Sequence, residues 1–154
     1  MAEEMEERTL MRLLDLLLRL AERHRFYISL LLMTSSDEKT DVPRLVRSAL
    51  RRSDIVFESS DCCTVLMAHT SKEDAARALA RFQRWCDDSM GLCFATATYP
   101  CDGATVESLM LAGETRLKAA RQAGFNAVSH VGPRYVEPTY KGVPTDNGAH
   151  GWAP

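Results

Sequence analysis

The chain has 154 residues, of which 45% are hydrophobic and 26% are charged, and its net charge is −2. This composition predicts one globular domain with a packed core, and the near-neutral charge argues against a nucleic-acid-binding protein. Five cysteines form no Cys-x-x-Cys pair and follow an acidic start without a secretory signal, so we expect a reduced, cytoplasmic protein. The leucine-rich run 10–20 is too short and too charged to span a membrane.

Residues 3–25 predict a helix, because good helix formers continue there without Gly or Pro. The predicted inner stripe follows steps of three and four residues, at Leu10, Leu13, Leu17, Leu20 and His24. Leu14, Leu16 and Leu18 widen it beyond one seam. Two interpretations stay open: the helix packs only on its own domain, or it also offers a face to a second copy in a homodimer.

The following elements alternate between strands and helices. The apolar run 26–33, FYISLLLM, predicts a central strand buried on both faces. Asp41 is the expected cap of a short helix with Pro43 in its first turn, and a strand hairpin follows over 55–67. We further expect a helix from Ser71 to about Asp88, a strand over 92–99, a helix from Thr105 to a stop at Gly124, and a strand over 125–131.

This order predicts an α/β domain over residues 26–131, with helices packed on a central mixed sheet. Residues 1–25 form the N-terminal helix, which serves packing or dimerisation. Residues 132–154 carry four of the six prolines and four of the eight glycines without any periodic pattern. They predict a flexible tail rather than a second domain.

Three motifs between residues 10 and 131 carry a family resemblance. The first is Arg51-Arg52-Ser53-Asp54, followed by a strand and the turn Ser59-Ser60-Asp61-Cys62-Cys63. The second is CFATATYP at 93–100, and the third is the helix 113–126, GETRLKAARQAGFN. Together they resemble the GGDEF domains, nucleotide cyclases that make cyclic di-GMP from two GTP molecules. The resemblance implies a GGDEF or palm-like fold, a central mixed sheet flanked by helices.

The sequence departs from that family at the residues that hold metal and phosphate. Ser59 and Ser60 replace two glycines and add β-carbons where the backbone approaches phosphate. Asp61 keeps one carboxylate, whereas Cys62 replaces a glutamate with a thiol that is uncharged at neutral pH. Met33-Thr34 stands where the family has its first metal-binding aspartate. One carboxylate does not hold two magnesium ions, so we expect no metal, no cofactor and no catalysis.

A ligand site is still implied by the resemblance. In the family, an Arg-x-x-Asp motif ahead of the hairpin binds cyclic di-GMP, and Arg51 and Asp54 stand at that place with Arg47 nearby. The other interpretation is a turn that ends the preceding helix, with Asp54 in local hydrogen bonds and Arg51 solvated. Arg121 matches a lysine of the family that contacts phosphate, which makes it an expected anion contact.

The expected function is that of a degenerate, catalytically inactive GGDEF-like regulatory domain in bacterial cyclic di-GMP signalling. It would act through protein–protein contact with an unidentified partner and sense cyclic di-GMP at Arg51 and Asp54. The alternative is a dedicated receptor for cyclic di-GMP or GTP. Residual diguanylate cyclase activity is the least favoured interpretation, and neither nucleic acid nor a membrane is an expected partner.

Overall fold

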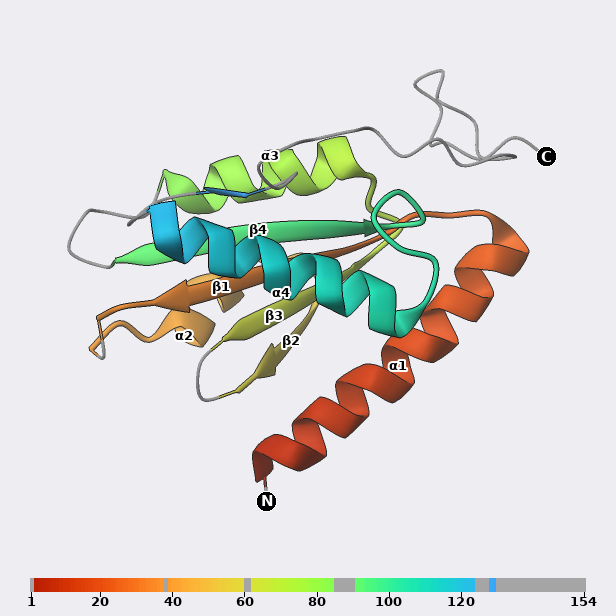
Figure 1. Cartoon of the computed structure of the whole chain (residues 1–154), viewed down its shortest axis with the longest axis horizontal. Helices are drawn as coiled ribbons and strands as arrows, with labels where there is room; N and C mark the ends of the chain where they lie inside the picture. Colours follow the sequence, from red (N-terminus) through yellow and green to blue (C-terminus); the bar gives the residue numbers. More distant parts are fainter. Residues whose placement is uncertain (1, 38, 60–61, 85–90, 124–127, 130–154) are drawn as a thin grey trace.

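The computed structural model describes residues 2–37, 39–59, 62–84, 91–123 and 128–129. Five strands form one sheet in the order β2-β3-β1-β4-β5 (Figure 1). Their bounds are β1 Ile28–Ser35, β2 Ile55–Glu58, β3 Cys63–Ala68, β4 Leu92–Tyr99 and β5 Val128–Ser129. The β4–β5 pair is parallel and the other neighbouring pairs are antiparallel. The predicted α/β fold with a mixed sheet is therefore confirmed.

The apolar run that was predicted as the central strand forms β1, which lies between β3 and β4. Seven of its eight residues are buried, as expected for a strand covered on both faces. It begins at Ile28, two residues later than predicted, because the chain still turns out of the first helix. Arg25 has a φ of 57°, and the backbone N–H of Phe26 donates to the carbonyl of Ala21 at 3.2 Å, which closes that helix.

Helices cover both faces of the sheet (Figure 1). One hydrophobic cluster joins the sheet to α1, Ala2–His24, and α4, Val106–Ala123. A second cluster joins the opposite face to α2, Val42–Arg47, and α3, Lys72–Gln83. Within the described part of the chain, none of the helices is both long and apolar enough to cross a membrane.

The inner stripe of α1 agrees with the prediction only in part. Leu10 is buried as predicted, and Leu13 and Leu17 are half-buried against the same cluster. The side chains that it buries are Leu10, Leu14, Leu18 and Ala21. Leu20 is 37% exposed, and His24 is exposed as well. Leucines occur on two sides of this helix, and both sets follow the helical period, so the sequence pattern does not separate them. Packing against the sheet selects the set that contains the small residue Ala21.

The predicted helix caps are confirmed. Asp41 accepts the backbone N–H of Arg44 at 3.1 Å, and Ser71 accepts that of Asp74 at 3.2 Å. The hydroxyl of Thr105 accepts the backbone N–H of Ser108 at 3.1 Å, at the start of α4. The helix that begins after Ser71 ends at Gln83 with Arg84 as its C-cap, earlier than the predicted end near Asp88. The predicted stop at Gly124, most of the strand over 125–131, and the tail 132–154 lie outside the described residues.

A buried group of charges fixes the loop between β4 and α4. The Asp102 side chain is only 2% exposed, and it accepts a hydrogen bond from the Arg116 guanidinium at 2.8 Å. Lys72 lies 3.7 Å from the same carboxylate, and the backbone N–H of Thr98 donates to it at 2.8 Å. Arg116 also donates to the carbonyl of Thr96. These contacts bind the end of β4 to both α3 and α4.

Candidate functional site

The hairpin of β2 and β3 is the first part of the candidate site. Its register pairs Phe57 with Thr64 and Glu58 with Cys63. Ser59 then closes the turn, since its backbone N–H donates to the carbonyl of Cys62 at 2.9 Å and its hydroxyl donates to the same oxygen at 3.0 Å. Ser60 and Asp61, the other predicted residues of this turn, lie outside the described residues.

The two cysteines of the turn lie on opposite faces of the sheet, as expected for neighbours on a strand. Cys62 packs against the cluster under α1 and α4, whereas Cys63 belongs to the cluster under α2 and α3. The Cys62 thiol is 3.9 Å from the hydroxyl of Thr64. Burial raises the pKa of Cys62 more than the Thr64 hydroxyl and the Arg121 guanidinium lower it. Both cysteines are therefore neutral thiols near pH 7.

Burial of Cys63 predicts a loss of stability at alkaline pH. Burial raises the pKa of this thiol from its ordinary value near 9 to about 12. Between these values the unfolded chain releases the proton while the native protein keeps it. The free energy of unfolding should thus fall by about 1.4 kcal/mol per pH unit above pH 9 on account of Cys63. Urea unfolding at a series of pH values measures this slope.

The matched variant for that measurement is Cys63→Ala, which removes the titrating group. Above pH 9, the free energy of unfolding of this variant should fall less steeply with pH than that of the wild-type protein. Part of the slope should remain, because burial also raises the pKa of Cys101, to about 11. Equal slopes in both proteins would contradict the assignment to Cys63.

Thr34 and Arg121 meet at the end of β1, beside the hairpin. Thr34 is 8% exposed, and its hydroxyl accepts a hydrogen bond from the Arg121 guanidinium at 2.9 Å. Thr34 stands in the segment where the resemblance implies a metal-binding aspartate. At Thr34 the strand therefore presents a hydroxyl that is bound by a cation, and not a carboxylate. Among the described residues, His, Cys, Asp and Glu form no group of three or more that could hold a metal ion.

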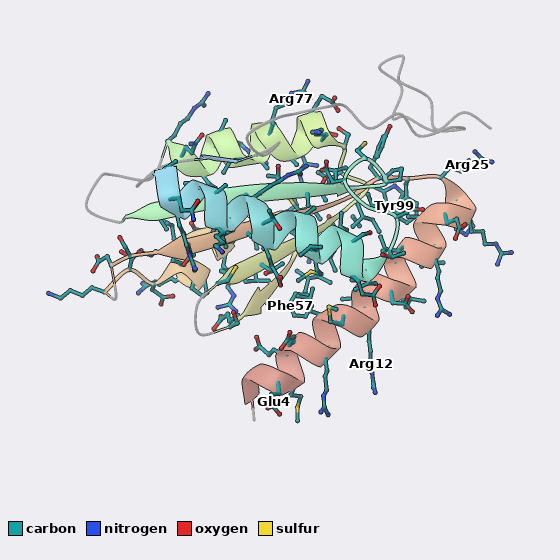
Figure 2. All side chains as sticks on the ribbon, in the orientation of Figure 1. Glu4, Arg12, Arg25, Phe57, Arg77 and Tyr99 are labelled. Carbon is teal, nitrogen blue, oxygen red and sulfur yellow. The ribbon has the colours of Figure 1, made fainter. Side chains whose placement is uncertain are left out.

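A pocket rich in arginine forms the second part of the candidate site. It has a volume of about 340 Å³ and is lined by Arg51, Asp74, Arg77, Ala80, Arg81 and Arg84. Arg51 comes from the loop after α2, and the other arginines come from α3 and the residue after it. Arg77 projects from α3 away from the sheet (Figure 2) and pairs with Asp74 at 3.0 Å. Four arginines and one aspartate line this pocket, so its charge is positive, and guanidinium groups are the side chains that pair best with anionic oxygens.

The residues predicted for ligand binding separate into two groups. Arg51 lines the pocket, whereas Arg47 pairs with Glu58 at 2.7 Å and is not among the lining residues. The Asp54 carboxylate accepts the backbone N–H of Arg51 at 2.9 Å, and the backbone N–H of Asp54 donates to the Arg51 carbonyl. The predicted local turn is thus confirmed. A ligand role for Arg51 and Asp54 stays a prediction.

Sequence reasoning missed the arginines of α3. Arg77, Arg81 and Arg84 recur at steps of four and three residues, which places them on one side of a helix. The sequence carries this pattern, on residues other than the apolar ones that predict the buried side of α3. The proximity of Arg51 to them depends on how α2 and α3 pack on the same face of the sheet.

Comparisons with known proteins bear on the fold. No protein-family model matches the chain, and no curated protein sequence matches it either. Solved structures do match. The GGDEF domain of the protein called TpbB or YfiN from Pseudomonas aeruginosa is 21% identical, over 79% of this chain and 87% of that one, with a TM-score of 0.68.

Two further solved structures agree. The active GGEEF domain of a diguanylate cyclase from Vibrio cholerae is 12% identical, over 85% of this chain and 97% of that one, with a TM-score of 0.69. A microbial GGDEF domain described for its interaction with cyclic di-GMP is 16% identical, over 73% of this chain and 82% of that one, with a TM-score of 0.62. The chain therefore has the fold of the GGDEF domains, the diguanylate cyclase fold.

Proposed function

We propose that this protein is a catalytically inactive GGDEF-like regulatory domain that binds cyclic di-GMP and acts through contact with another protein. The observation that carries the proposal is the combination of its two site regions. The end of β1 holds a Thr34 hydroxyl bound by Arg121, whereas the pocket at Arg51 offers several guanidinium groups. Among its described residues, the first region presents a hydroxyl and a cation where magnesium prefers carboxylates, and the second region suits an anion.

The charges beside the hairpin disfavour the metal ions that catalysis would need. Phosphoryl transfer between nucleotides depends on metal ions that neutralise the triphosphate. A magnesium ion at the end of β1 would meet the Arg121 guanidinium and the neutral thiol of Cys62, and among the described groups that act on this thiol only the Glu114 carboxylate would favour a cation. The described residues therefore support binding of an anion without turnover.

The positive charge of the arginine pocket favours binding of cyclic di-GMP. The ligand carries two phosphodiester groups, and guanidinium groups bind such oxygens through paired hydrogen bonds. Arg77 is partly neutralised by Asp74, which leaves Arg51, Arg81 and Arg84 as the main contacts. The Asp54 carboxylate holds the backbone of Arg51 in the turn, so in this proposal it positions Arg51 beside the pocket.

Calorimetric titration of the purified protein with cyclic di-GMP tests this proposal. We expect Arg51→Ala to weaken binding about tenfold or more, because loss of one charge-assisted contact costs about 1.5–3 kcal/mol. Arg47→Ala is the matched control and should bind like the wild-type protein, since Arg47 pairs with Glu58 instead. Equal weakening by both variants would contradict the assignment of the pocket.

A parallel assay with GTP and magnesium separates the remaining functions. Turnover of GTP would overturn the proposal of inactivity. If neither ligand binds, the receptor role is wrong, and contact with a protein partner remains as the function. The same arginine pocket also favours the alternative, a dedicated receptor for cyclic di-GMP or GTP. Binding of a ligand without any effect on a protein contact would favour that alternative.

A further inference from the structure

All four arginines of α1 lie on the side of the helix that is turned away from the sheet. They are Arg8, Arg12, Arg19 and Arg23, and at about 100° per residue they fall within about 60° of one another around the helix axis. Leu14, which is fully buried, lies about 150° from the middle of this set. All four arginines are exposed, and Figure 2 shows Arg12 pointing away from the domain. The helix thus presents a row of positive charge to the solvent.

Three large apolar side chains are exposed among these arginines. Met5, Leu16 and Leu20 are 70%, 54% and 37% exposed, and they also fall within about 60° of one another. They are three of the five large hydrophobic side chains that are exposed in the described part of the chain. Apolar side chains that gather on one exposed surface mark a site of interaction. We call these three residues and the four arginines the outer face of α1.

The acidic residues nearest to the outer face are engaged at its borders. Asp15 pairs with Arg19 at 3.0 Å. On the other border, the Glu6 carboxylate accepts the backbone N–H of Glu58 at 2.8 Å, so it is directed toward β2. The outer face therefore keeps an excess of positive charge, although the whole chain has a net charge of −2.

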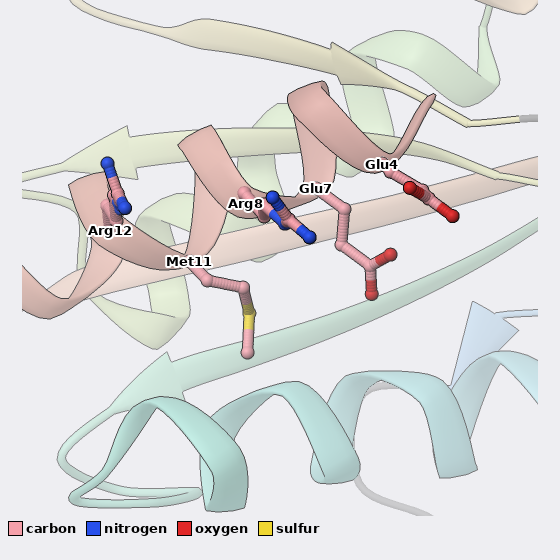
Figure 3. Close-up of a pocket in the computed structure, with 5 residues that line it drawn as sticks. All are labelled: Glu4, Glu7, Arg8, Met11 and Arg12. Carbon is pink, nitrogen blue, oxygen red and sulfur yellow. The ribbon is translucent and has the colours of Figure 1, made fainter. Parts of the chain in front are cut away.

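A shallow groove separates the outer face from the side of α1 near α4. It has a volume of about 510 Å³ and is lined by Glu4, Glu7, Arg8, Met11 and Arg12. Figure 3 shows Met11 pointing toward α4 and Arg12 pointing away from it. The acids of the first two turns that line this groove thus lie beside the outer face, and not on it.

We propose that the outer face of α1 docks on an anionic lipid surface, with the helix axis parallel to the membrane plane. From Met5 to Arg23 the face is about 27 Å long, at 1.5 Å per residue. Guanidinium groups bind the phosphate oxygens of lipid headgroups, and the leucines enter the boundary between headgroups and acyl chains. This contact revises the expectation of no membrane partner, because neither the total charge nor the search for a spanning segment reveals such a face.

Other occupants fit the outer face less well. A second copy of the chain would bring its own four arginines against these four, and like charges repel. Nucleic acid would pair with the arginines through its phosphates but would leave Leu16 and Leu20 without apolar contacts. An acidic protein would need carboxylates at the spacing of the arginines, whereas mobile lipid headgroups adapt to any spacing.

Docking through α1 leaves the ligand pocket accessible. The arginine pocket involves α3, which packs on the face of the sheet opposite α1. Lipid binding and ligand binding are therefore separate measurements, and the inference does not depend on the proposed function.

Sedimentation of the full chain with lipid vesicles tests the inference. Vesicles of equal parts phosphatidylglycerol and phosphatidylcholine should bind the protein, whereas vesicles of phosphatidylcholine alone should bind it far less. Arg12→Glu with Arg23→Glu should raise the dissociation constant for the anionic vesicles about tenfold or more, since each basic residue near an anionic surface contributes to binding. Leu16→Ala should raise it about fivefold, because less apolar surface enters the membrane.

The matched control is Arg44→Glu with Arg52→Glu, which changes the net charge by the same amount. Both residues are exposed, and they lie in α2 and the loop after it, on the face of the sheet opposite α1. This control should bind the anionic vesicles like the wild-type protein. Circular dichroism melting of each variant checks that the chain still folds.

Three results with vesicles would overturn the inference. They are a wild-type chain that does not bind the anionic vesicles, equal binding to both kinds of vesicle, and equal weakening by the two double variants. Tighter binding of a labelled single-stranded oligonucleotide, lost with Arg12→Glu and Arg23→Glu, would assign the face to nucleic acid instead. Self-association without lipid that is lost with Leu16→Ala would assign it to a second copy.

Calorimetric titration of the same variants with cyclic di-GMP keeps the two proposals apart. A chain that binds the ligand but no vesicles would refute the membrane contact alone. A chain that binds vesicles but no ligand would refute the receptor role alone.

Discussion

Replacement of Arg116 by alanine is expected to lower the free energy of unfolding by about 3–5 kcal/mol, because it leaves a buried carboxylate poorly paired. The Arg116 side chain is 13% exposed and its Asp102 partner is 2% exposed. Without Arg116, the partners of Asp102 among the described residues are Lys72 at 3.7 Å and the backbone N–H of Thr98. The hydrogen bond from Arg116 to the carbonyl of Thr96 would also be lost. Urea unfolding at pH 7 measures the loss.

Arg77→Ala is the matched control for this variant. Arg77 also pairs with an aspartate, Asp74, at 3.0 Å, but its side chain is 78% exposed. Exposed pairs contribute about 0–1 kcal/mol, so this change should have little effect on stability. The double variant Arg116→Met with Asp102→Asn should lose less than Arg116→Ala, since no carboxylate then remains. Similar losses for Arg116→Ala and Arg77→Ala would show that burial does not strengthen the first pair.

Leu14→Ala should also destabilise the protein strongly, by about 2–5 kcal/mol. Leu14 lies on the side of α1 that packs on the sheet, and its side chain is fully buried. It belongs to the cluster that also contains Phe57 and Leu109. Its truncation removes apolar contacts and leaves a cavity at the centre of the layer. Thermal and urea unfolding, followed by circular dichroism, measure the change.

Leu16→Ala supplies the comparison on the same helix. Leu16 is 54% exposed, so its truncation should change the free energy of unfolding by less than about 1 kcal/mol. The pair therefore tests which side of α1 faces the sheet. A larger loss for Leu16 than for Leu14 would mean that α1 packs through a different side.

The sequence predicts most of the fold because its local signals agree with one another. The long apolar run in β1 and the run in β4 identify strands buried on both faces. Asp41, Ser71 and Thr105 identify helix starts, since their side chains satisfy the first backbone N–H groups. Each of these signals lies within one element, so tertiary contacts are not needed to interpret it.

The features that the sequence did not reveal depend on contacts between elements. The inner side of α1 was predicted only in part, because Leu13 and Leu14 each belong to a plausible stripe and only the packing on the sheet shows that Leu14 is the more deeply buried. The arginine pocket was missed because Arg51 meets the α3 arginines only after both segments pack on one face. The turn at Asp54 was one of two alternatives that the sequence left open, and the structure contains it. It could be predicted because its hydrogen bonds join residues only three positions apart.

The contact between α1 and the hairpin has a consequence for how the sheet ends. β2 is the outermost strand on its side, and the backbone N–H of Glu58 donates to the carboxylate of Glu6 at 2.8 Å. Outer strands with unsatisfied backbone groups recruit strands from other molecules and promote aggregation. The first helix thus protects part of this edge strand. If α1 detached from the sheet, the exposed backbone of β2 could pair with a strand of another molecule.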